Sequence, residues 1–294
     1  MGPPEGGPYD VGSYNTRVFA WAGAGLFAAS LTYFLFTYAV TFAETAAGPL
    51  RASSVAADVA LFAAFALHHS VFARERVRAW VARHLAPPEQ RRQVGPLERA
   101  DEPALARRVA QRRDIPANTV ERSVYVWAAS LMLITVCAFW QPIPGVVWDL
   151  RGPAAWALRG IQLFGVWLTL RGAAVIDIWD LSGVKPARPT PNSQRPTPTH
   201  DAAGSSAWGL GIGSWDFKTD GPYGWVRHPI YLGWFLIVFA MPVMTMTRLL
   251  FAALSSAYIL IAIPFEERSL LRASEGAYAE YARKVPWKLL PRVY

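Results

Sequence analysis

The fold of this 294-residue chain is decided by residues 221–267, which read GPYGWVRHPIYLGWFLIVFAMPVMTMTRLLFAALSSAYILIAIPFEE. The stretch contains two apolar runs, at residues 230–246 and 249–265. Only Thr247 and Arg248 lie between them. A helix needs about 20 mainly apolar residues to cross the hydrocarbon core of a bilayer. Each run approaches this length, so we expect two adjacent helices that form a tight hairpin within a membrane.

Four further apolar segments precede this hairpin, at residues 18–42, 55–72, 124–140 and 154–179. The composition agrees with a membrane protein, because 53% of the residues are hydrophobic and only 17% are charged. A soluble domain usually carries about 25% charged residues. The sequence therefore predicts an all-α integral membrane protein with about six transmembrane helices and a C-terminal helical hairpin.

Lysine and arginine are concentrated in three segments, at residues 74–122, at residues 182–228 and after Glu266. The other turns contain one arginine each, and these are Arg51, Arg151 and Arg248. Cytoplasmic loops of membrane proteins carry the excess of basic residues. Six crossings with both termini in the cytoplasm satisfy this rule for every basic segment. The Ala-, Arg- and Pro-rich composition further suggests the cytoplasmic membrane of a bacterium with a GC-rich genome.

We expect three parts along the chain. Residues 1–181 would form a four-helix membrane region that includes a basic cytosolic insert at about 86–118. Residues 182–220 would form a Pro- and Gly-rich cytosolic loop, and residues 221–294 a cofactor-binding core. The insert could lie as an amphipathic helix on the anionic leaflet or form a solvated linker. It lacks interleaved aromatic residues, so no nucleic-acid partner is predicted.

Cys137 is the single cysteine of the chain. It therefore excludes a disulfide within the chain and a cysteine-based zinc site. No other cluster suggests a metal site, and we predict none.

The residues that could bind a ligand or take part in a reaction lie where the hairpin begins. Gly221 and Pro222 end any preceding helix, and Pro229 favours the first turn of the next one. Arg227 and His228 are therefore expected at a helix N-terminus at the membrane face. The free backbone N–H groups and the positive dipole end suit an anion such as a carboxylate. A basic pair at this place could also serve only as a snorkelling anchor.

Aromatic and acidic side chains complete this region. The rings of Tyr223, Trp225 and Tyr231 suit a sulfonium or an adenine. Because a hairpin returns its second helix beside the start of its first, Glu266 and Glu267 should lie near the basic pair. Adjacent carboxylates at the end of a spanning helix are costly unless they are paired, and this marks them as functional candidates. The alternative is a simple ion pair with a nearby arginine.

The combined pattern covers residues 221–287: Gly-Pro-Tyr, Arg-His-Pro-x-Tyr-x-Gly, the hairpin, Glu-Glu-x-x-Leu, Tyr-x-x-Tyr and Val-Pro. It resembles the isoprenylcysteine carboxyl methyltransferase and phospholipid methyltransferase superfamily. Within and outside this pattern, stretches at residues 69–74, 121–126, 140–142 and 244–253 are similar to the bacterial methanethiol S-methyltransferase branch of this superfamily, and residues 177–183 resemble it more loosely.

The resemblance implies a cytosolic pocket for S-adenosylmethionine. It implies that Tyr223, His228, Pro229 and Tyr231 line this pocket. One of Glu266 and Glu267 would hold the amino group of the cofactor, and the sequence does not choose between them. A thiol reacts as its thiolate, so a positive site that lowers its pKa helps. Arg227 and His228 are the catalytic candidates for this reason, and His69 and Arg74 are candidates on the substrate side.

The predicted function is therefore S-adenosylmethionine-dependent methylation of a small thiol, methanethiol to dimethyl sulfide, within membrane lipids. Two alternatives remain. The acceptor could be lipid-borne, an isoprenoid carboxylate or a lipid headgroup, because the inserts could reshape the entrance to the site. The chain could also be a non-catalytic membrane scaffold that retains the fold.

Overall fold

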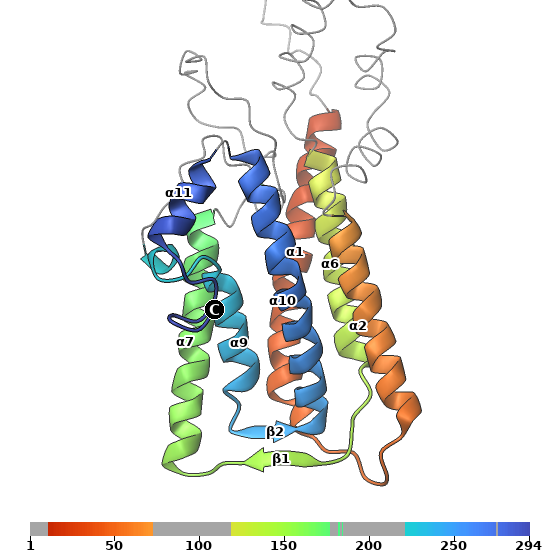
Figure 1. The fold of residues 1–294 in the computed structure, drawn as a ribbon. Coiled ribbons are helices and arrows are strands. Elements are labelled where there is room, and N and C mark those ends of the chain that lie inside the picture. The colour runs from red at the N-terminus through yellow and green to blue at the C-terminus, as the bar shows by residue number, and fades with distance from the viewer. Residues whose placement is uncertain (1–10, 73–118, 177–181, 183, 185–220, 275) are drawn as a thin grey trace, which may run out of the picture.

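The computed structural model describes residues 11–72, 119–176, 182, 184, 221–274 and 276–294 (Figure 1). The described α-helices are α1 (Val11–Ala39), α2 (Ala52–Phe72), α6 (Thr119–Phe139), α7 (Pro153–Ile176), α9 (Pro229–Phe239), α10 (Met246–Ala273) and α11 (Ala277–Lys284). Two 3-10 helices, η1 (Thr41–Ala43) and η4 (Gly221–Gly224), and two strands, β1 (Val146–Asp149) and β2 (Val243–Thr245), complete the elements. Each of the six predicted apolar segments contains a helix, which confirms a mainly helical fold.

Some predicted features lie outside the described residues. These are the basic insert at 86–118, residues 185–220 of the Pro- and Gly-rich loop, and Arg74.

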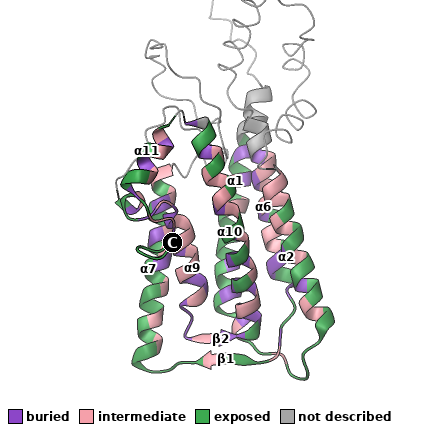
Figure 2. Ribbon diagram, viewed as in Figure 1, coloured by how far each residue is buried: buried purple, intermediate pink, exposed green. Residues whose placement is uncertain are grey.

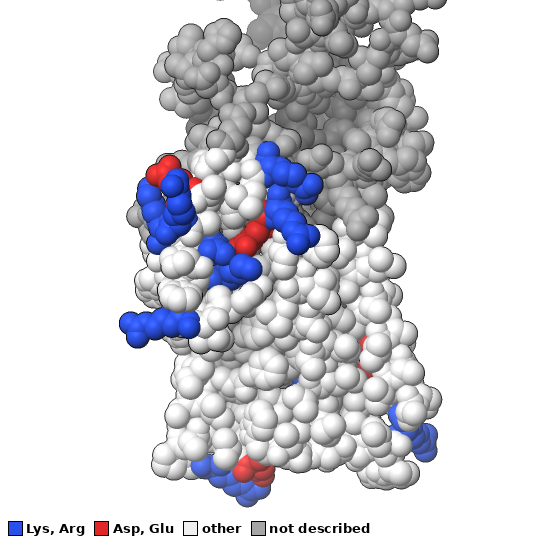
Figure 3. Space-filling view, in the orientation of Figure 1, with Lys and Arg blue, Asp and Glu red and all other residues white. Residues whose placement is uncertain are grey.

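Three helical segments of the described chain are long and apolar enough to cross a membrane, namely Val18–Ala43, Ala52–Val71 and Met246–Arg272. Ser123–Phe139 and Pro229–Phe239 are apolar helices of shorter length. Figure 3 shows an uncharged band around most of the visible face, with charged side chains gathered mainly at its two ends. The protein is thus a membrane protein, and the count of six crossings stays a prediction.

Helix α10 lies between two groups of helices, the pair α7 and α9 on one side and α1, α2 and α6 on the other (Figure 1). Buried residues face the interior of the bundle, and its outer faces are largely exposed (Figure 2). Phe251 of α10 is central to the main core cluster. Its ring centroid lies 5.4 Å from that of Phe34 and 5.3 Å from that of Trp140. Aromatic packing therefore joins α10 to the N-terminal helices.

The connection between the last two spanning segments differs from the prediction. Helix α9 ends at Phe239 and α10 begins at Met246, so Thr247 and Arg248 lie inside α10 and not in the turn. Pro242 in the link cannot continue a helix. The link instead pairs with the segment before α7, where β2 runs antiparallel to β1. The all-α prediction was therefore wrong in this detail, because it omitted a two-stranded sheet.

The prediction for Arg248 was also wrong, because it placed this residue among the arginines of the turns. It is only 2% exposed. Its guanidinium donates to the backbone oxygens of Tyr38 at 2.9 Å and Ala39 at 2.6 Å, and to that of Val243. Helix α1 ends at Ala39, where the last carbonyls lack helical partners and carry the negative end of the helix dipole. Arg248 thus ties the end of α1 to the start of α10.

Glycines bring α7 and α9 close together. A Cβ atom on Gly165 of α7 would lie 2.8 Å from the carbonyl oxygen of Gly233 on α9. A Cβ atom on Gly233 would lie 2.7 Å from the carbonyl oxygen of Gly165. Small residues at such crossings allow helix backbones to approach within a membrane. This contact fixes α9, and with it the segment that carries Arg227 and His228.

Candidate functional site

The first turn of α9 forms one wall of the site. His228 is the N-cap residue of α9 and Pro229 follows in its first turn, as the sequence predicted. The backbone N–H of Arg227 donates to the carbonyl oxygen of Trp287 at 2.8 Å. The N–H of His228 donates to the carbonyl oxygen of Lys288 at 2.9 Å. The segment after α11 therefore holds the two basic residues in place.

A buried ion pair joins the segment just before α9 to α10. Arg227 Nε donates to Glu267 Oε1 at 2.7 Å, and the two side chains are 8% and 12% exposed. Arg227 Nη1 also donates to the backbone oxygens of Val285 at 2.9 Å and Pro286 at 2.7 Å. The predicted meeting of the basic pair and the acidic pair at one end of the hairpin is observed. Arg227 thus donates to three acceptors, which suits a positioning role.

The carboxylate of Glu267 contacts further side chains. Tyr278 Oη donates to Glu267 Oε1 at 3.0 Å, and His228 Nε2 lies 3.3 Å from the same oxygen. Lys288 Nζ lies 3.8 Å from Glu267 Oε2. Including Arg227, four side chains from three parts of the chain converge on this carboxylate. Glu267 thus links these three parts of the chain.

Glu266 has a different environment. Its Oε2 accepts a hydrogen bond from Tyr231 Oη at 2.9 Å and lies 3.9 Å from His228 Nδ1. The ring of Tyr231 stacks on that of His228, with centroids 5.4 Å apart and planes 11° apart. Successive residues of an α-helix point about 100° apart. Glu266 therefore faces the Tyr231 side of the site, while Glu267 faces α11 and the C-terminal segment.

Two tyrosines of α11 support this arrangement. Tyr281 Oη donates to the backbone oxygen of Tyr223 at 2.9 Å, which anchors η4. Burial raises the pKa of Tyr278 above its ordinary range, and the negative charge of Glu267 raises it further. Burial and the charge of Glu266 likewise raise the pKa of Tyr223. These hydroxyls therefore stay protonated at neutral pH, and Tyr278 remains a donor to its carboxylate.

The sequence identified Tyr278 and Tyr281 only as parts of a motif and assigned them no role. Their spacing of three residues was the available signal, because residues at i and i+3 share one face of a helix. The turn that sets this short helix against α10 requires Gly276, whose φ is +99°.

Of the two substrate-side candidates, only His69 belongs to the described residues. His69 is near the end of α2, where its Nδ1 is 2.6 Å from Tyr125 Oη on α6. It is therefore not part of the cluster around Glu267. Trp225 is half exposed, and its ring centroid lies 6.3 Å from that of Trp167 on α7.

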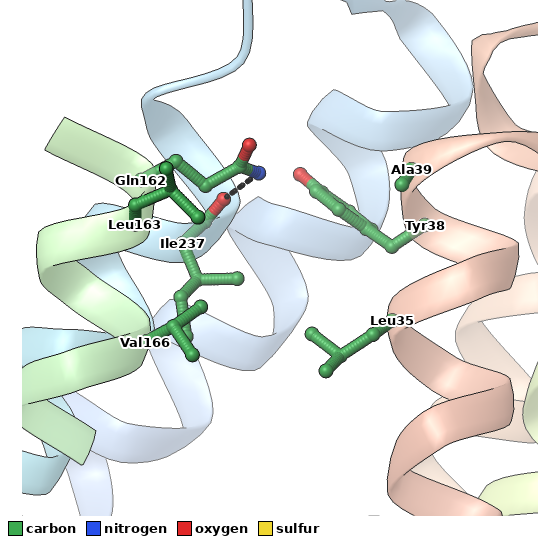
Figure 4. Close-up of a pocket in the computed structure, with 7 residues that line it drawn as sticks. All are labelled: Leu35, Tyr38, Ala39, Gln162, Leu163, Val166 and Ile237. Carbon is green, nitrogen blue, oxygen red and sulfur yellow. Dashed lines mark hydrogen bonds between the residues drawn. The ribbon is translucent and has the colours of Figure 1, made fainter. Parts of the chain in front are cut away.

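A cavity of about 170 Å³ separates α1 from α7 (Figure 4). It is lined by Leu35, Tyr38, Ala39, Gln162, Leu163, Val166 and Ile237. Gln162 Nε2 donates to the backbone oxygen of Ile237 at 3.1 Å. Tyr38 and Ile237 lie near the C-terminal ends of α1 and α9, and this is the Arg248 end of the bundle. The mostly apolar lining suits a hydrocarbon chain better than a charged cofactor.

Comparison with known proteins gives consistent results. The family model described as the isoprenylcysteine carboxyl methyltransferase family matches residues 214–272. The chain is 32% identical to Methanethiol S-methyltransferase 2 of Bradyrhizobium diazoefficiens, covering 82% of this chain and 74% of that one. It is 31% identical to Methanethiol S-methyltransferase of Mycobacterium tuberculosis, covering 80% and 79%. For the protein of that name from Crocosphaera subtropica the values are 30%, 78% and 72%. No solved structure matches the chain.

Proposed function

Because this chain belongs to the isoprenylcysteine carboxyl methyltransferase family, we propose that it transfers the methyl group of S-adenosylmethionine to a small thiol. The acceptor we favour is methanethiol, and the product is then dimethyl sulfide. The relatives named methanethiol S-methyltransferase, similar over most of both chains, support this choice. The observation that carries the proposal is the convergence of Arg227, His228, Glu266 and Glu267 at one end of the hairpin.

The polar and aromatic groups of the site match the chemical groups of the cofactor. Glu266 receives one hydrogen bond from the described residues, so its carboxylate retains capacity to hold an ammonium group. The first N–H groups of α9, next to Pro229, suit a carboxylate. The aromatic faces of Tyr231 and His228 suit a sulfonium. When bound, S-adenosylmethionine supplies a methyl group that is already activated by the positive sulfur.

The two acids receive separate roles in this proposal. Glu266 binds the amino group of the cofactor, because Glu267 is already committed to Arg227, Tyr278 and His228. Glu267 keeps the first turn of α9 against the end of α10. Tyr223, whose backbone oxygen accepts a hydrogen bond from Tyr281, is proposed to line the cofactor pocket.

His228 and Arg227 serve this site differently. His228 lies between both carboxylates, at 3.9 Å from Glu266 and 3.3 Å from Glu267, and contacts the cofactor. Arg227 is paired with Glu267, so its charge is largely neutralised. Arg227 therefore positions Glu267 and the segment after α11 relative to α9. The basic end of the bundle that carries α11 is proposed to face the cytoplasm, where the cofactor is made.

Product analysis on the purified protein tests the proposal. The protein is incubated with S-adenosylmethionine labelled in its methyl group, methanethiol and lipid vesicles. We expect the label in volatile dimethyl sulfide. Label in the lipid extract would favour a lipid-borne acceptor instead. Folded protein that labels neither and binds no S-adenosylhomocysteine would favour a scaffold.

A further inference from the structure

A second polar cluster lies inside the bundle, where α2, α6 and α10 meet. His69 Nδ1 is 2.6 Å from Tyr125 Oη, and Ser70 Oγ is 3.2 Å from Tyr258 Oη. The ring of Tyr258 packs edge-on against that of His69, with centroids 6.1 Å apart. Burying polar groups within membrane segments costs free energy, so such groups usually have a function. These four residues are called the His69 cluster below.

Tyr258 and Tyr231 connect the His69 cluster with the cofactor-side residues. Tyr258 lies eight residues before Glu266 on α10, which is about 12 Å along the helix and about 80° around it. Glu267 points to the opposite side of the helix from Tyr258, since nine residues correspond to about 180°. Tyr258 and Tyr231 pack against the same buried cluster of Ile259, Ile263 and Leu289. The two polar regions are therefore neighbours on the Glu266 side of α10.

The surroundings of His69 suit a small uncharged acceptor. Phe65 stacks on the His69 ring with centroids 5.9 Å apart, and the ring centroids of Tyr125 and Tyr258 lie 5.7 Å and 6.1 Å from it. Among the described residues, these neighbours offer aromatic faces and hydroxyl groups, together with the imidazole of His68. A thiol can pack on such faces. A carboxylate acceptor would instead require a positive partner for its charge.

We infer that the His69 cluster is the acceptor site and that the imidazole of His69 removes the proton of the thiol. This inference rests on the proposed function. The S–H bond breaks, its electron pair stays on sulfur, and the proton bonds to a ring nitrogen of His69. The thiolate is then the nucleophile for methyl transfer, and the imidazolium returns its proton to water. In the tautomer that this step requires, Nδ1–H of His69 donates to the Tyr125 hydroxyl oxygen, and Nε2 is then the basic nitrogen.

Acceptor acidity distinguishes this chemical role from simple helix packing. The test compares methanethiol with 2,2,2-trifluoroethanethiol, a small thiol that is more acidic. His69→Gln should lower kcat/KM for methanethiol by about 100-fold, which is typical for loss of a general base. The loss for the acidic thiol should stay below about tenfold, because this acceptor ionises without help. Tyr125→Phe, which keeps the ring, should show the same pattern more weakly.

Infrared spectroscopy gives a readout that does not depend on turnover. Methanethiol bound to the cofactor-free wild type should show an S–H stretching band shifted by hydrogen bonding to the imidazole. His69→Leu, which removes the acceptor, should abolish this shift and leave the affinity for S-adenosylhomocysteine unchanged. An unshifted band in the wild type would overturn the inference, as would equal loss for both thiols. The proposed function would survive either result. A wild type that methylates no thiol would overturn both.

Discussion

Glu266 and Glu267 are neighbours in the chain, yet the structure gives them different partners. Glu267 is bound by Arg227 and Tyr278 in a nearly closed site, while Glu266 accepts a single hydrogen bond from Tyr231 among the described residues. The hairpin pattern was enough to predict that these acids meet the basic pair. Their separate roles depend on the rotation of α10 about its axis, which a sequence motif does not specify.

Substitution of Glu267 should therefore reduce stability. Glu267→Gln leaves the charge of Arg227, whose side chain is 8% exposed, without its counter-ion. Removing one partner of a buried ion pair costs about 3 kcal/mol. We expect a clearly lower midpoint of thermal unfolding in detergent.

Glu280→Gln is the matched control. Glu280 pairs with Lys284 at 2.9 Å, but its side chain is 59% exposed. Exposed pairs contribute little to stability. The midpoint should therefore stay near that of the wild type. Equal midpoints for the two variants would show that Glu267 does not organise the site.

For the helices and strands, the positions of the helices were predicted correctly from the sequence, but the structure of the segments that connect them was not. Periodicity and apolar length define where a helix can form, and each predicted segment contains one. The β1–β2 pairing joins segments about 100 residues apart, so no local pattern predicts it. Arg248 was misread for the same reason, because its acceptors on α1 are distant in sequence.

The packing of α7 on α9 can be tested with two glycines of the same helix. In Gly165→Ala the new Cβ would meet Gly233 O and Leu236 Cβ at 2.8 Å, so α9 would have to shift. Overpacking of this kind costs about 1–3 kcal/mol. Gly160→Ala adds a methyl group into open space and should be neutral or slightly stabilising. The measurement is the midpoint of thermal unfolding, which should be lower for Gly165→Ala than for Gly160→Ala. Equal midpoints would contradict the close contact between α7 and α9.

At the scale of the whole molecule, charge distribution defines the orientation that we propose. Charged residues gather at the end where α11 lies, and a smaller group lies at the β1 end (Figure 3). Composition alone was sufficient to predict a membrane protein. The proposed acceptor site was only partly predictable, because His69 was named from the motif but its partners Tyr125 and Tyr258 come from helices that only tertiary packing brings together.

Labelling of single cysteines tests the orientation. Cys137, the natural cysteine, is buried, so the unmodified chain provides the background. Arg151→Cys and Glu280→Cys introduce thiols at exposed positions near the two ends, where the native side chains are 85% and 59% exposed. A membrane-impermeant maleimide should label position 151 in intact cells and position 280 only after lysis. The reverse pattern would contradict a cytoplasmic cofactor site.

Calorimetric titration of the purified protein with S-adenosylhomocysteine measures whether the Glu266 end of the hairpin binds the cofactor product. The wild type should bind, and Glu266→Gln should bind at least about tenfold more weakly, because a charge-assisted hydrogen bond contributes about 1.5–3 kcal/mol. Folded wild-type protein that releases no binding heat at several temperatures would contradict a methyltransferase site at this end of the hairpin. Undiminished binding by Glu266→Gln would contradict the role given to that residue.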